Sequence, residues 1–310
     1  MSARNKTTLK LGKREVSVSN LDKVFYPGTG FTKGDVIDYY ARIAPVLVPH
    51  VKGRPVSLKR YPDGVQGQFF YEKQCPSHAP DWIKEKTVKV AKENGEYIDY
   101  CVFDELPALV WAANIANLEL HTFQHRRGAM QRPTGLVFDL DPGPPADIIQ
   151  CCQVALWLRT MFAALGLECF PKTSGSKGMQ LVIPLNTPTN YDKTKAFAHQ
   201  VADTLAAAHP ELVVSDMKKK LREGKVFIDW SQNDDKKTTV SVYSLRAKDV
   251  PSASTPLKWS EVEAAWKNRA RARKGKTLVF EADEVLQRVK KWGDLFEPVL
   301  TLKQKLPKIE

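Results

Sequence analysis

Residues 135–145, GLVFDLDPGPP, place two carboxylates, Asp139 and Asp141, at the end of an apolar strand. Side chains on a strand alternate between its two faces, so Phe138 and Leu140 point toward a core and the two aspartates share the other face. Two neighbouring anions repel each other and resist joint ionisation, so we expect a cation between them. The alternative is that an aspartate before Pro-Gly begins a turn, and an isolated Asp-x-Asp pattern favours that simpler interpretation.

The segments that follow this strand alternate between helix and strand patterns in the order β-α-β-β-α-β, a split βαβ motif. After the strand at 135–141, we expect a helix at 146–166, strands at 167–173 and 178–185, a helix at 192–208 and a strand at 224–230. In that topology the fourth strand lies beside the first. Asp229, on the fourth strand, would then join Asp139 and Asp141.

The remaining patterns predict a strand-rich N-terminal part and a helical tail. Before residue 135 we expect strands at 14–20, 54–61, 67–72 and 96–103, a helix at 30–48 and a buried helix at 106–120. Thr32 serves as the N-cap of the first of these helices, with Asp35 three residues later. After residue 235 we expect a strand at 237–247 that carries Arg246, a basic helical stretch at 259–276 and a helix at 282–296.

Composition places limits on the class of protein. The 310 residues are enough for roughly two domain-sized units or one large one. The net charge of +12 favours a polyanionic partner, with nucleic acid first and an anionic membrane surface second. No run approaches the roughly 18 apolar residues of a spanning helix, and the N-terminus has no apolar signal region. We therefore expect a cytoplasmic, nucleoid-associated protein without a membrane partner.

The five cysteines carry little signal for chemistry. They are odd in number and form no C-x-x-C pair. This pattern predicts reduced, mostly structural thiols in a cytosolic protein and argues against a zinc site.

Three clustered carboxylates suit hard divalent cations such as Mg²⁺ or Mn²⁺, which prefer oxygen ligands. Two such ions roughly 4 Å apart stabilise both the attacking and the leaving oxygen of a phosphoryl displacement. Nucleotidyl transfer and phosphodiester hydrolysis both use that arrangement. The carboxylates alone therefore leave a polymerase and a nuclease open.

Residues 172–180, KTSGSKGMQ, distinguish between these two reactions. Small residues let backbone N–H groups approach phosphate oxygens, while Ser174, Ser176 and Lys177 add donors and charge. The spacing is not that of a P-loop, and alone the string is typical of a flexible β-turn. Beside three carboxylates, however, it favours a triphosphate cradle, which a nuclease does not need.

Taken together, VFDLDPG, KTSGSKGMQL, KVFIDWSQND and TTVSVYSLRA resemble, in this order, the polymerase domain of the bacterial ligase D family. That primase-polymerase module acts in non-homologous end joining and belongs to the archaeo-eukaryotic primase superfamily. The runs LDKVFYPGTGFTKGDVIDYYARIA, LKRYPDG and FFYEKQ match it as well, so the resemblance covers nearly the whole chain.

The resemblance implies an α+β protein with a primase-polymerase fold. Its catalytic core would be RRM-like, with the β-α-β-β-α-β order, and would follow a β-rich N-terminal subdomain. We expect a single polymerase domain over 1–310, divided into an N-terminal subdomain at 1–134, a catalytic core at 135–250 and a helical extension at 251–310. The N-terminal subdomain would contact the template and a 5′-phosphate.

The resemblance also implies roles for individual residues. Two metal ions, Mn²⁺ or Mg²⁺ with Mn²⁺ favoured, would be held by the catalytic residues Asp139, Asp141 and Asp229. The residues implied to contact the NTP or dNTP substrate are Lys59, Phe70, His121, Ser174, Lys177, Gln180, Arg222, Gln232 and Arg246. Those implied to contact DNA are Lys23, Lys33, Arg60 and Phe69.

Several of these residues have simpler explanations when they are considered alone. His121 would lie near the ribose 2′-hydroxyl and favour ribonucleotides, but alone it is typical of a helix-end histidine satisfied by backbone. Phe69 and Phe70 would stack on a base, although neighbours on a strand usually divide between core and surface, so we expect one to stack. Lys23 and Lys33 would grip a downstream 5′-phosphate, but alone each is an ordinary solvated lysine.

One position departs from the family pattern. Gln180 stands where members often carry a histidine that contacts the triphosphate. An amide still donates a hydrogen bond but cannot carry a proton, so we expect weaker charge stabilisation there without loss of activity. The chain also lacks a K-x-D-G ligase motif, so it resembles a freestanding or excised polymerase domain.

The function that follows is a DNA-dependent nucleotidyltransferase at double-strand breaks in bacterial non-homologous end joining. It would act as a gap-filling polymerase and terminal transferase, prefer ribonucleotides and use two metal ions. DNA ends or gaps with a 5′-phosphate, Ku and a separate ATP-dependent DNA ligase are the partners implied. The alternatives are a catalytically silent nucleic-acid-binding repair module and a metal-dependent nuclease.

Overall fold

The computed structural model describes residues 6–89, 97–272 and 276–307. The chain forms two compact units, of which unit 1 consists of Met1–Phe123, Tyr243–Ala253 and Glu281–Gly293, and unit 2 of the remainder. This division differs from the expected boundaries, because two later segments pack with the N-terminal part of the chain. The first five residues, Glu96 of the expected strand at 96–103 and residues 273–275 of the expected basic stretch lie outside the described residues.

Unit 1 combines antiparallel strands with three helices among its described residues. Its strands are β1 (Lys6–Leu11), β2 (Arg14–Ser19), β3 (Val24–Tyr26), β4 (Phe31–Thr32), β5 (Pro55–Arg60), β6 (Phe70–Glu72), β7 (Lys84–Lys89), β8 (Tyr97–Val102) and β9 (Asn117–Thr122). Its helices are α1 (Lys33–Val51), α2 (Leu106–Asn114) and α6 (Ala282–Trp292). In its main sheet β5 pairs with β9, β8 and β6, and β8 pairs with β7.

Helix α1 begins where the sequence predicts. Thr32 accepts a hydrogen bond from the Asp35 N–H, and the Asp35 side chain accepts one from the Thr32 N–H, which completes a capping box. The buried stripe of the helix includes Tyr39 and Tyr40. The Tyr40 hydroxyl donates to the Leu118 carbonyl at 2.7 Å, and this bond ties the helix to β9.

Unit 2 contains the predicted elements in their predicted order, with one additional two-residue strand between the second helix and the last strand of the motif. Its strands are β10 (Gly135–Pro142), β11 (Phe170–Thr173), β12 (Met179–Pro184), β13 (Val213–Val214), β14 (Val226–Asp229) and β15 (Thr239–Val240). Its helices are α3 (Ile148–Ala164), α4 (Tyr191–Ala208), α5 (Trp259–Lys267) and α7 (Pro298–Thr301), with short 3₁₀ turns η1 (Lys219–Leu221), η2 (Trp230–Gln232) and η3 (Arg269–Arg271).

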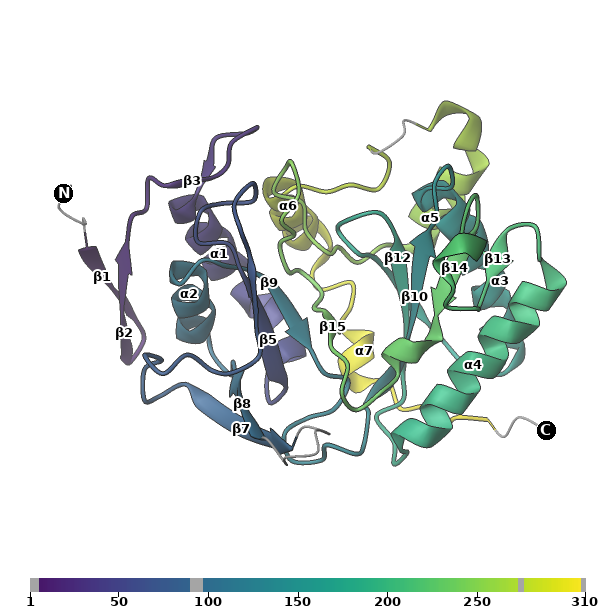
Figure 1. Cartoon of the computed structure of the whole chain (residues 1–310), viewed down its shortest axis with the longest axis horizontal. Coiled ribbons are helices and arrows are strands. Elements are labelled where there is room, and N and C mark those ends of the chain that lie inside the picture. The colour runs from purple at the N-terminus through teal and green to yellow at the C-terminus, as the bar shows by residue number, and fades with distance from the viewer. Residues whose placement is uncertain (1–5, 90–96, 273–275, 308–310) are drawn as a thin grey trace. The chain divides into compact units, whose positions relative to one another are not determined.

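The sheet of unit 2 runs in the order β11-β12-β10-β14-β13 (Figure 1). The prediction that the fourth strand of the motif lies beside the first is therefore confirmed, since β14 pairs with β10. The α+β class is confirmed as well. In the register of this pair, Asp139 stands directly opposite Asp229.

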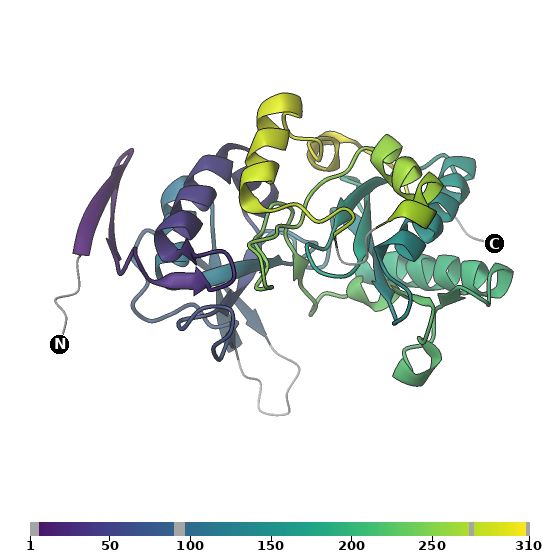
Figure 2. The same cartoon turned by 90° about the horizontal axis from the view of Figure 1, so that it is seen from above.

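Alternation along β10 determines which face of the sheet is buried. Leu136, Phe138 and Leu140 are fully buried in a core that also contains apolar residues of α3 and α4. Helix α5 packs against α3 (Figure 2). Each buried leucine contributes about 1.5–3 kcal/mol relative to an exposed one. The opposite face of β10 carries Asp139 and Asp141.

Two predicted elements are corrected by the structure. The expected helix at 106–120 ends at Asn114, and β9 follows it, because Ala116 adopts a left-handed φ of 65° that turns the chain. His121 consequently lies on a strand instead of a helix end. The expected strand at 237–247 shrinks to β15, because Tyr243 has a left-handed φ of 63°, which a strand does not accommodate.

The expectation that every cysteine is reduced is wrong for one pair. Cys75 and Cys101 form a disulfide, and their Cα atoms are 4.9 Å apart, within the range that such a bond requires. The Cys75 N–H donates to the Asp99 carbonyl, which brings this loop against β8. Cys151, Cys152 and Cys169 are buried free thiols.

Within the part of the chain that the structure describes, no helix has both the length and the apolar character needed to cross a membrane.

Candidate functional site

A row of four polar side chains crosses the sheet of unit 2. Strand register places Lys172 opposite Gln180, Gln180 opposite Asp139, and Asp139 opposite Asp229. Residues in register on neighbouring strands share a face, and Asp139 lies on the face opposite the helix-packed core. Asp141 follows two residues after Asp139 on that same face. The topology therefore places the three predicted aspartates on one face of the sheet, with Asp139 and Asp229 directly opposite each other.

The neighbouring charges act on Asp139. Burial raises the pKa of Asp139 well above its ordinary value, and the negative charge of Asp141 and then that of Asp229 raise it further. A hydrogen bond from Gln180 and the positive charge of Lys172 act in the opposite direction. The three carboxylates repel one another, so a cation bound between them would reduce this electrostatic repulsion.

The two oxygens of Asp229 are held by the 3₁₀ turn that follows it. Oδ1 accepts from the Ser231 N–H at 3.1 Å and from the Ser231 hydroxyl at 2.5 Å. Oδ2 accepts from the Gln232 amide nitrogen at 2.6 Å. Gln232, which we expected to contact the nucleotide, thus orients a carboxylate of the site in this structure.

The donor set fits a hard divalent cation, although the side chains do not yet surround one. Among residues 6–89, 97–272 and 276–307, no three His, Cys, Asp or Glu side chains stand in a ready-made metal geometry. Both oxygens of Asp229 accept hydrogen bonds from its own 3₁₀ turn. Three carboxylates are nevertheless the oxygen donors that Mg²⁺ and Mn²⁺ prefer. The buried Oε1 atom of Gln180 has no hydrogen-bond partner, so the site also contains an unsatisfied acceptor.

Sequence reasoning gave no role to Lys172, which is buried on β11. Its ammonium group donates to the Val240 carbonyl at 3.1 Å and to the Ser254 hydroxyl at 2.7 Å. These bonds hold a positive charge in the row that contains Asp139. The feature of the sequence that could have indicated this role is a lysine within a short strand. Charged side chains are rarely buried unless they are paired.

The loop between β11 and β12 is organised by Ser174. Its N–H donates to the Gly178 carbonyl at 2.9 Å, and its hydroxyl oxygen accepts from the Ser176 and Gly178 N–H groups, both at 3.2 Å. Ser174 is buried, whereas Lys177 is exposed. Ser174 therefore shapes the predicted phosphate loop, and Lys177 is the cation at its surface.

This loop lies against the end of β10 and beside a cavity. A Cβ atom on Gly178 would stand 2.1 Å from the Leu140 carbonyl oxygen, so only glycine permits this approach. The cavity, of about 280 Å³, is lined in part by Pro142, Ser176 and Lys177. Its contact with both segments places the loop beside the strand that carries the aspartates.

Arg222, expected to flank the third carboxylate, is engaged in a structural contact. Its guanidinium lies 3.7 Å from the centroid of the Phe227 ring, and Nη2 donates to the Met217 carbonyl at 2.8 Å. Phe227 is the register partner of Asp141 on the neighbouring strand. A Cβ on Gly143 would overlap the Arg222 carbonyl oxygen at 1.9 Å, so this arginine packs closely against the segment after β10.

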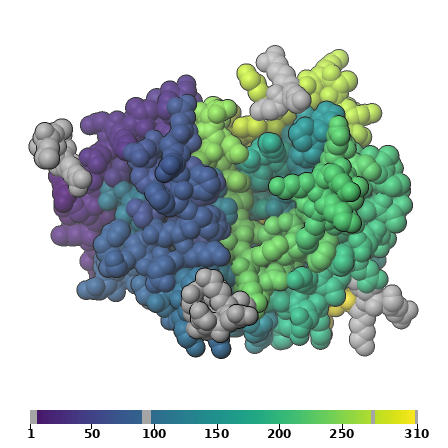
Figure 3. Space-filling view, viewed as in Figure 1, coloured from purple at the N-terminus to yellow at the C-terminus, as the bar shows by residue number. Residues whose placement is uncertain are grey.

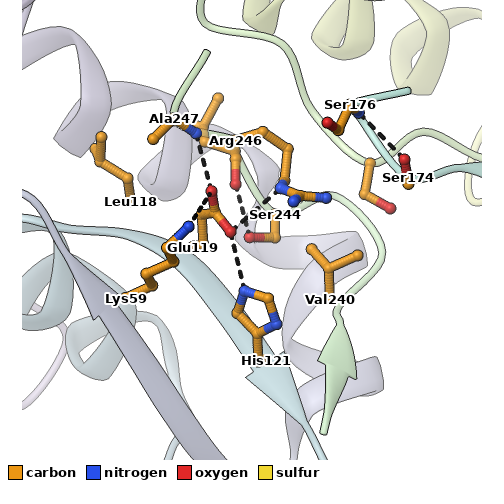
Figure 4. Close-up of polar contacts among 12 residues, drawn as sticks. Lys59, Leu118, Glu119, His121, Ser174, Ser176, Val240, Ser244, Arg246 and Ala247 are labelled. Atoms are coloured by element: carbon orange, nitrogen blue, oxygen red, sulfur yellow. Dashed lines mark hydrogen bonds and ion pairs between the residues drawn. The ribbon is translucent and has the colours of Figure 1, made fainter. Parts of the chain in front are cut away.

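In unit 1, three residues predicted to contact the nucleotide converge on a buried carboxylate, Glu119 (Figure 4). His121 Nε2 lies 3.0 Å from Glu119 Oε2, and Arg246 Nε lies 3.2 Å from the same oxygen. Lys59 Nζ lies 3.6 Å from Oε1. The sequence alone did not predict a role for Glu119, because residues 106–120 have a helical pattern. On a strand, its spacing of two from His121 places both on one face.

The two adjacent phenylalanines do not divide between core and surface as expected. Phe69 is 54% exposed and Phe70 is 55% exposed. The Lys59 ammonium group lies 4.5 Å from the centroid of the Phe69 ring. The segment that carries them, dark blue in Figure 3, forms part of the surface of unit 1. Both rings are thus available for contact with a base.

Arg60, expected to contact DNA, is engaged within unit 1. Its Nη1 atom pairs with Glu72 Oε2 at 2.7 Å, and Nε donates to the Ile115 carbonyl at 2.8 Å. In this structure Arg60 therefore links β5 to β6 and to the turn after α2.

Lys23 and Lys33 do converge, through the small β3–β4 sheet. The Lys33 N–H donates to the Lys23 carbonyl at 2.8 Å, and Lys33 Nζ donates to the Ser19 carbonyl at 2.6 Å. Burial and, to a smaller extent, the positive charge of Lys23 together lower the pKa of Lys33 to about 8. Lys23 Nζ is paired with Asp63 at 2.8 Å. Because the charge of Lys23 disfavours the charged form of Lys33, an anion bound near both would stabilise the two ammonium groups.

The family model for the LigD primase-polymerase domain matches residues 32–296. The chain belongs to this family. Membership implies a nucleotidyltransferase in general terms. The match covers most of both units, including every predicted site residue except Lys23.

Curated relatives agree with this assignment. The chain is 42% identical over 286 residues to the multifunctional non-homologous end joining protein LigD of Mycolicibacterium smegmatis. The aligned region covers 92% of this chain and 36% of that protein. It is 31% identical over 281 residues to the bifunctional LigD of Bacillus subtilis, covering 90% of this chain and 43% of that protein. The chain thus spans well under half the length of these relatives.

A solved structure is similar along nearly its whole length. The polymerase domain of Mycobacterium tuberculosis ligase D, determined in complex with DNA, superposes with a TM-score of 0.84 at 39% sequence identity. The similarity covers 93% of this chain and 99% of that one. The chain therefore has the fold of a LigD polymerase domain.

Proposed function

We propose that this protein is a DNA-dependent nucleotidyltransferase that fills gaps and extends ends at double-strand breaks, with a preference for ribonucleotides. The observation that carries the proposal is the meeting of Asp139, Asp141 and Asp229 on one face of the unit 2 sheet. The adjacent loop, with Lys177 at its surface beside a cavity, would bind the triphosphate. Family membership supports polymerase chemistry for this arrangement.

In the reaction we propose, the primer 3′-hydroxyl attacks the α-phosphate of the nucleotide and pyrophosphate leaves. Two divalent ions held by the three aspartates, with Mn²⁺ favoured over Mg²⁺, would offset the charge that develops on the attacking and leaving oxygens. Gln232 and Ser231 hold Asp229 through hydrogen bonds, and Lys177 attracts the triphosphate. Gln180 would donate to an oxygen of the site without carrying charge.

The residues of unit 1 would select and align the substrates. His121 would contact the ribose 2′-hydroxyl, with Lys59 and Arg246 near the nucleotide. Phe69 and Phe70, both exposed, would stack on bases of either strand, since any base offers an aromatic face. Lys23 and Lys33 would bind the 5′-phosphate on the far side of a gap.

A cytoplasmic, nucleoid-associated location and partnership with Ku and an ATP-dependent DNA ligase complete the proposal. Both rest on the end-joining role of the LigD relatives. The net charge of +12 is consistent with binding to DNA.

A filling assay on a gapped duplex tests this function. The downstream strand is prepared with and without a 5′-phosphate, and NTP is compared with dNTP in Mg²⁺ and in Mn²⁺. We expect templated addition, faster with NTP than with dNTP and stimulated by the 5′-phosphate. A silent DNA-binding module would add nothing under any condition, and a nuclease would shorten the primer without added triphosphate.

The 5′-phosphate effect should depend on pH because of Lys33. Its pKa of about 8 means that the ammonium group is charged at pH 7 and largely neutral at pH 9. A bound phosphate favours the charged form, so affinity for the 5′-phosphorylated gap should fall as pH rises through 8 and above. We expect the affinity ratio of phosphorylated to unphosphorylated gaps to fall about tenfold between pH 7 and pH 9.5, measured by fluorescence anisotropy.

The variant Lys33→Met provides the control for this pH dependence. It should bind both gapped duplexes with a ratio near that of the wild type at pH 9.5, and the ratio should no longer change with pH. A wild-type ratio that stays constant from pH 7 to pH 9.5 would contradict the role of Lys33.

A further inference from the structure

Glu119 is a buried carboxylate that receives donors from three separate segments of unit 1. It is 1% exposed and lies on the central part of β9. Lys59 reaches it from β5, and Arg246 and the Ala247 N–H reach it from the loop after Tyr243, the latter at 3.1 Å. His121 reaches it from two residues along the same strand (Figure 4).

These neighbours favour the ionised form of Glu119. Although burial alone would raise the pKa of Glu119, the hydrogen bond from His121 and the charge of Arg246 lower it to about 2. The group is therefore an ionised carboxylate, which can only accept hydrogen bonds. Removing its charge would leave two buried or half-buried cations, Lys59 and Arg246, without their anion.

An acceptor-only partner determines the tautomer of His121. Because Glu119 Oε2 lies 3.0 Å from His121 Nε2, that ring nitrogen must carry the proton of the pair. In a neutral imidazole the other nitrogen, Nδ1, is then an acceptor. Burial lowers the pKa of His121, which favours the neutral ring. The edge of Tyr71, whose ring centroid is 5.6 Å away, further restricts the ring orientation.

An accepting Nδ1 discriminates between sugars. A ribose 2′-hydroxyl can donate a hydrogen bond to it, whereas a deoxyribose has no group at that position. When the hydroxyl is missing, the fixed acceptor loses this hydrogen bond, and the loss costs binding free energy.

We propose that Glu119 is a positioning residue that holds His121 as a hydrogen-bond acceptor for the ribose 2′-hydroxyl and thereby sets the preference for ribonucleotides. The inference rests on the proposed function, because it assigns the sugar contact of the same reaction. Glu119 itself touches no substrate. Its second effect is to hold Lys59 and Arg246 in fixed positions near the same ring.

The central experiment compares the variant Glu119→Gln with wild type in kcat and KM for NTP and for dNTP. Glutamine has the same size but lacks the charge that pairs with Lys59 and Arg246. Its single carbonyl oxygen cannot accept from both His121 and the Ala247 N–H. We expect the ratio of kcat/KM for NTP to that for dNTP to fall about ten- to a hundredfold. The loss should lie mainly in KM for NTP, because the sugar contact is a binding interaction.

Two further variants separate positioning from general damage. Glu105→Gln removes another carboxylate of unit 1, one that pairs with Arg14 at 3.2 Å, and should leave the NTP-to-dNTP ratio unchanged. In a His121→Ala background, Glu119→Gln should alter that ratio no further, because its effect passes through the histidine. If Glu119→Gln slows NTP and dNTP use equally and leaves the ratio unchanged, Glu119 only supports the fold and the proposal is overturned.

A measurement on the wild-type protein keeps the proposal testable if the variant does not fold. The ¹⁵N chemical shifts of the imidazole, assigned by comparison with His121→Ala, report which ring nitrogen carries the proton. We expect the Nε2–H tautomer across pH 6–8, and an Nδ1–H tautomer would overturn the proposal. Absence of any templated addition by the wild type would instead refute the proposed function, so the two failures are distinguishable.

Discussion

Replacing either Asp139 or Asp141 with asparagine should reduce nucleotide addition at least about a thousandfold. Each substitution keeps the shape of the side chain but removes a negative charge from a cluster that we propose to hold two divalent ions. The carboxylates already repel one another, since both Asp141 and Asp229 raise the pKa of Asp139. The loss should therefore appear in kcat for primer extension and in metal affinity, measured by Mn²⁺ titration with electron paramagnetic resonance.

The same charge argument predicts the effect of these variants on stability. Because the native-state pKa of Asp139 is raised, the metal-free protein loses stability as pH rises from the ordinary aspartate pKa through the raised one. Asp139→Asn removes that pH-dependent loss, so the metal-free variant should unfold at the same or a higher temperature than wild type at pH 8. Loss of activity would then not reflect unfolding.

Asp203→Asn provides the matched control for these substitutions. Asp203 is an exposed aspartate of α4 that pairs with His199, one turn earlier in the same helix, at 3.3 Å. Its substitution should leave extension within about twofold of wild type. Wild-type extension rates in both Asp139→Asn and Asp141→Asn, with normal folding, would refute the assignment of the site.

Gly178→Ala should displace the phosphate loop from the end of β10. The added Cβ would stand 2.1 Å from the Leu140 carbonyl oxygen. Because this oxygen belongs to the backbone, the clash cannot be relieved by a change of side-chain rotamer. Overpacking of this kind costs about 1–3 kcal/mol of stability. Because the loop carries Lys177, we expect KM for the nucleotide to rise by up to about a hundredfold.

Urea unfolding and steady-state kinetics measure the two effects of Gly178→Ala. Gly128→Ala is the control, since a Cβ at Gly128 would have no atom within 4 Å and the position lies in the same unit. It should change the unfolding free energy by less than about 0.5 kcal/mol. Equal stability and equal KM in the two variants would show that the contact with Leu140 does not position the loop.

The sequence was most informative where local patterns and topology rules agree. The β-α-β-β-α-β order and the alternation of β10 were sufficient to predict that Asp229 lies beside Asp139, because parallel crossovers leave few possible strand orders. The capping box of α1 was also predicted, since its two hydrogen bonds involve residues only three positions apart.

The errors occurred where a single backbone angle or a distant partner overrides local preference. The left-handed residues Ala116 and Tyr243 end a helix and a strand that the side-chain pattern would continue. Consequently His121 was placed on the wrong kind of element, and Glu119 was not recognised at all. The disulfide between Cys75 and Cys101 joins positions 26 residues apart, a pairing that spacing alone does not reveal.

By itself, the sequence determined that three acidic groups from two strands would share one face of a sheet. Both the alternation of side chains along a strand and the order of helices and strands can be read from the sequence. The tertiary structure alone decided which side chains hold the others in place. Lys172, Ser231 and Glu119 acquire their roles from partners that lie on other segments or in a turn of particular shape. Charge and hydrogen bonding act over a few ångströms in space, and only the folded chain brings those atoms that close.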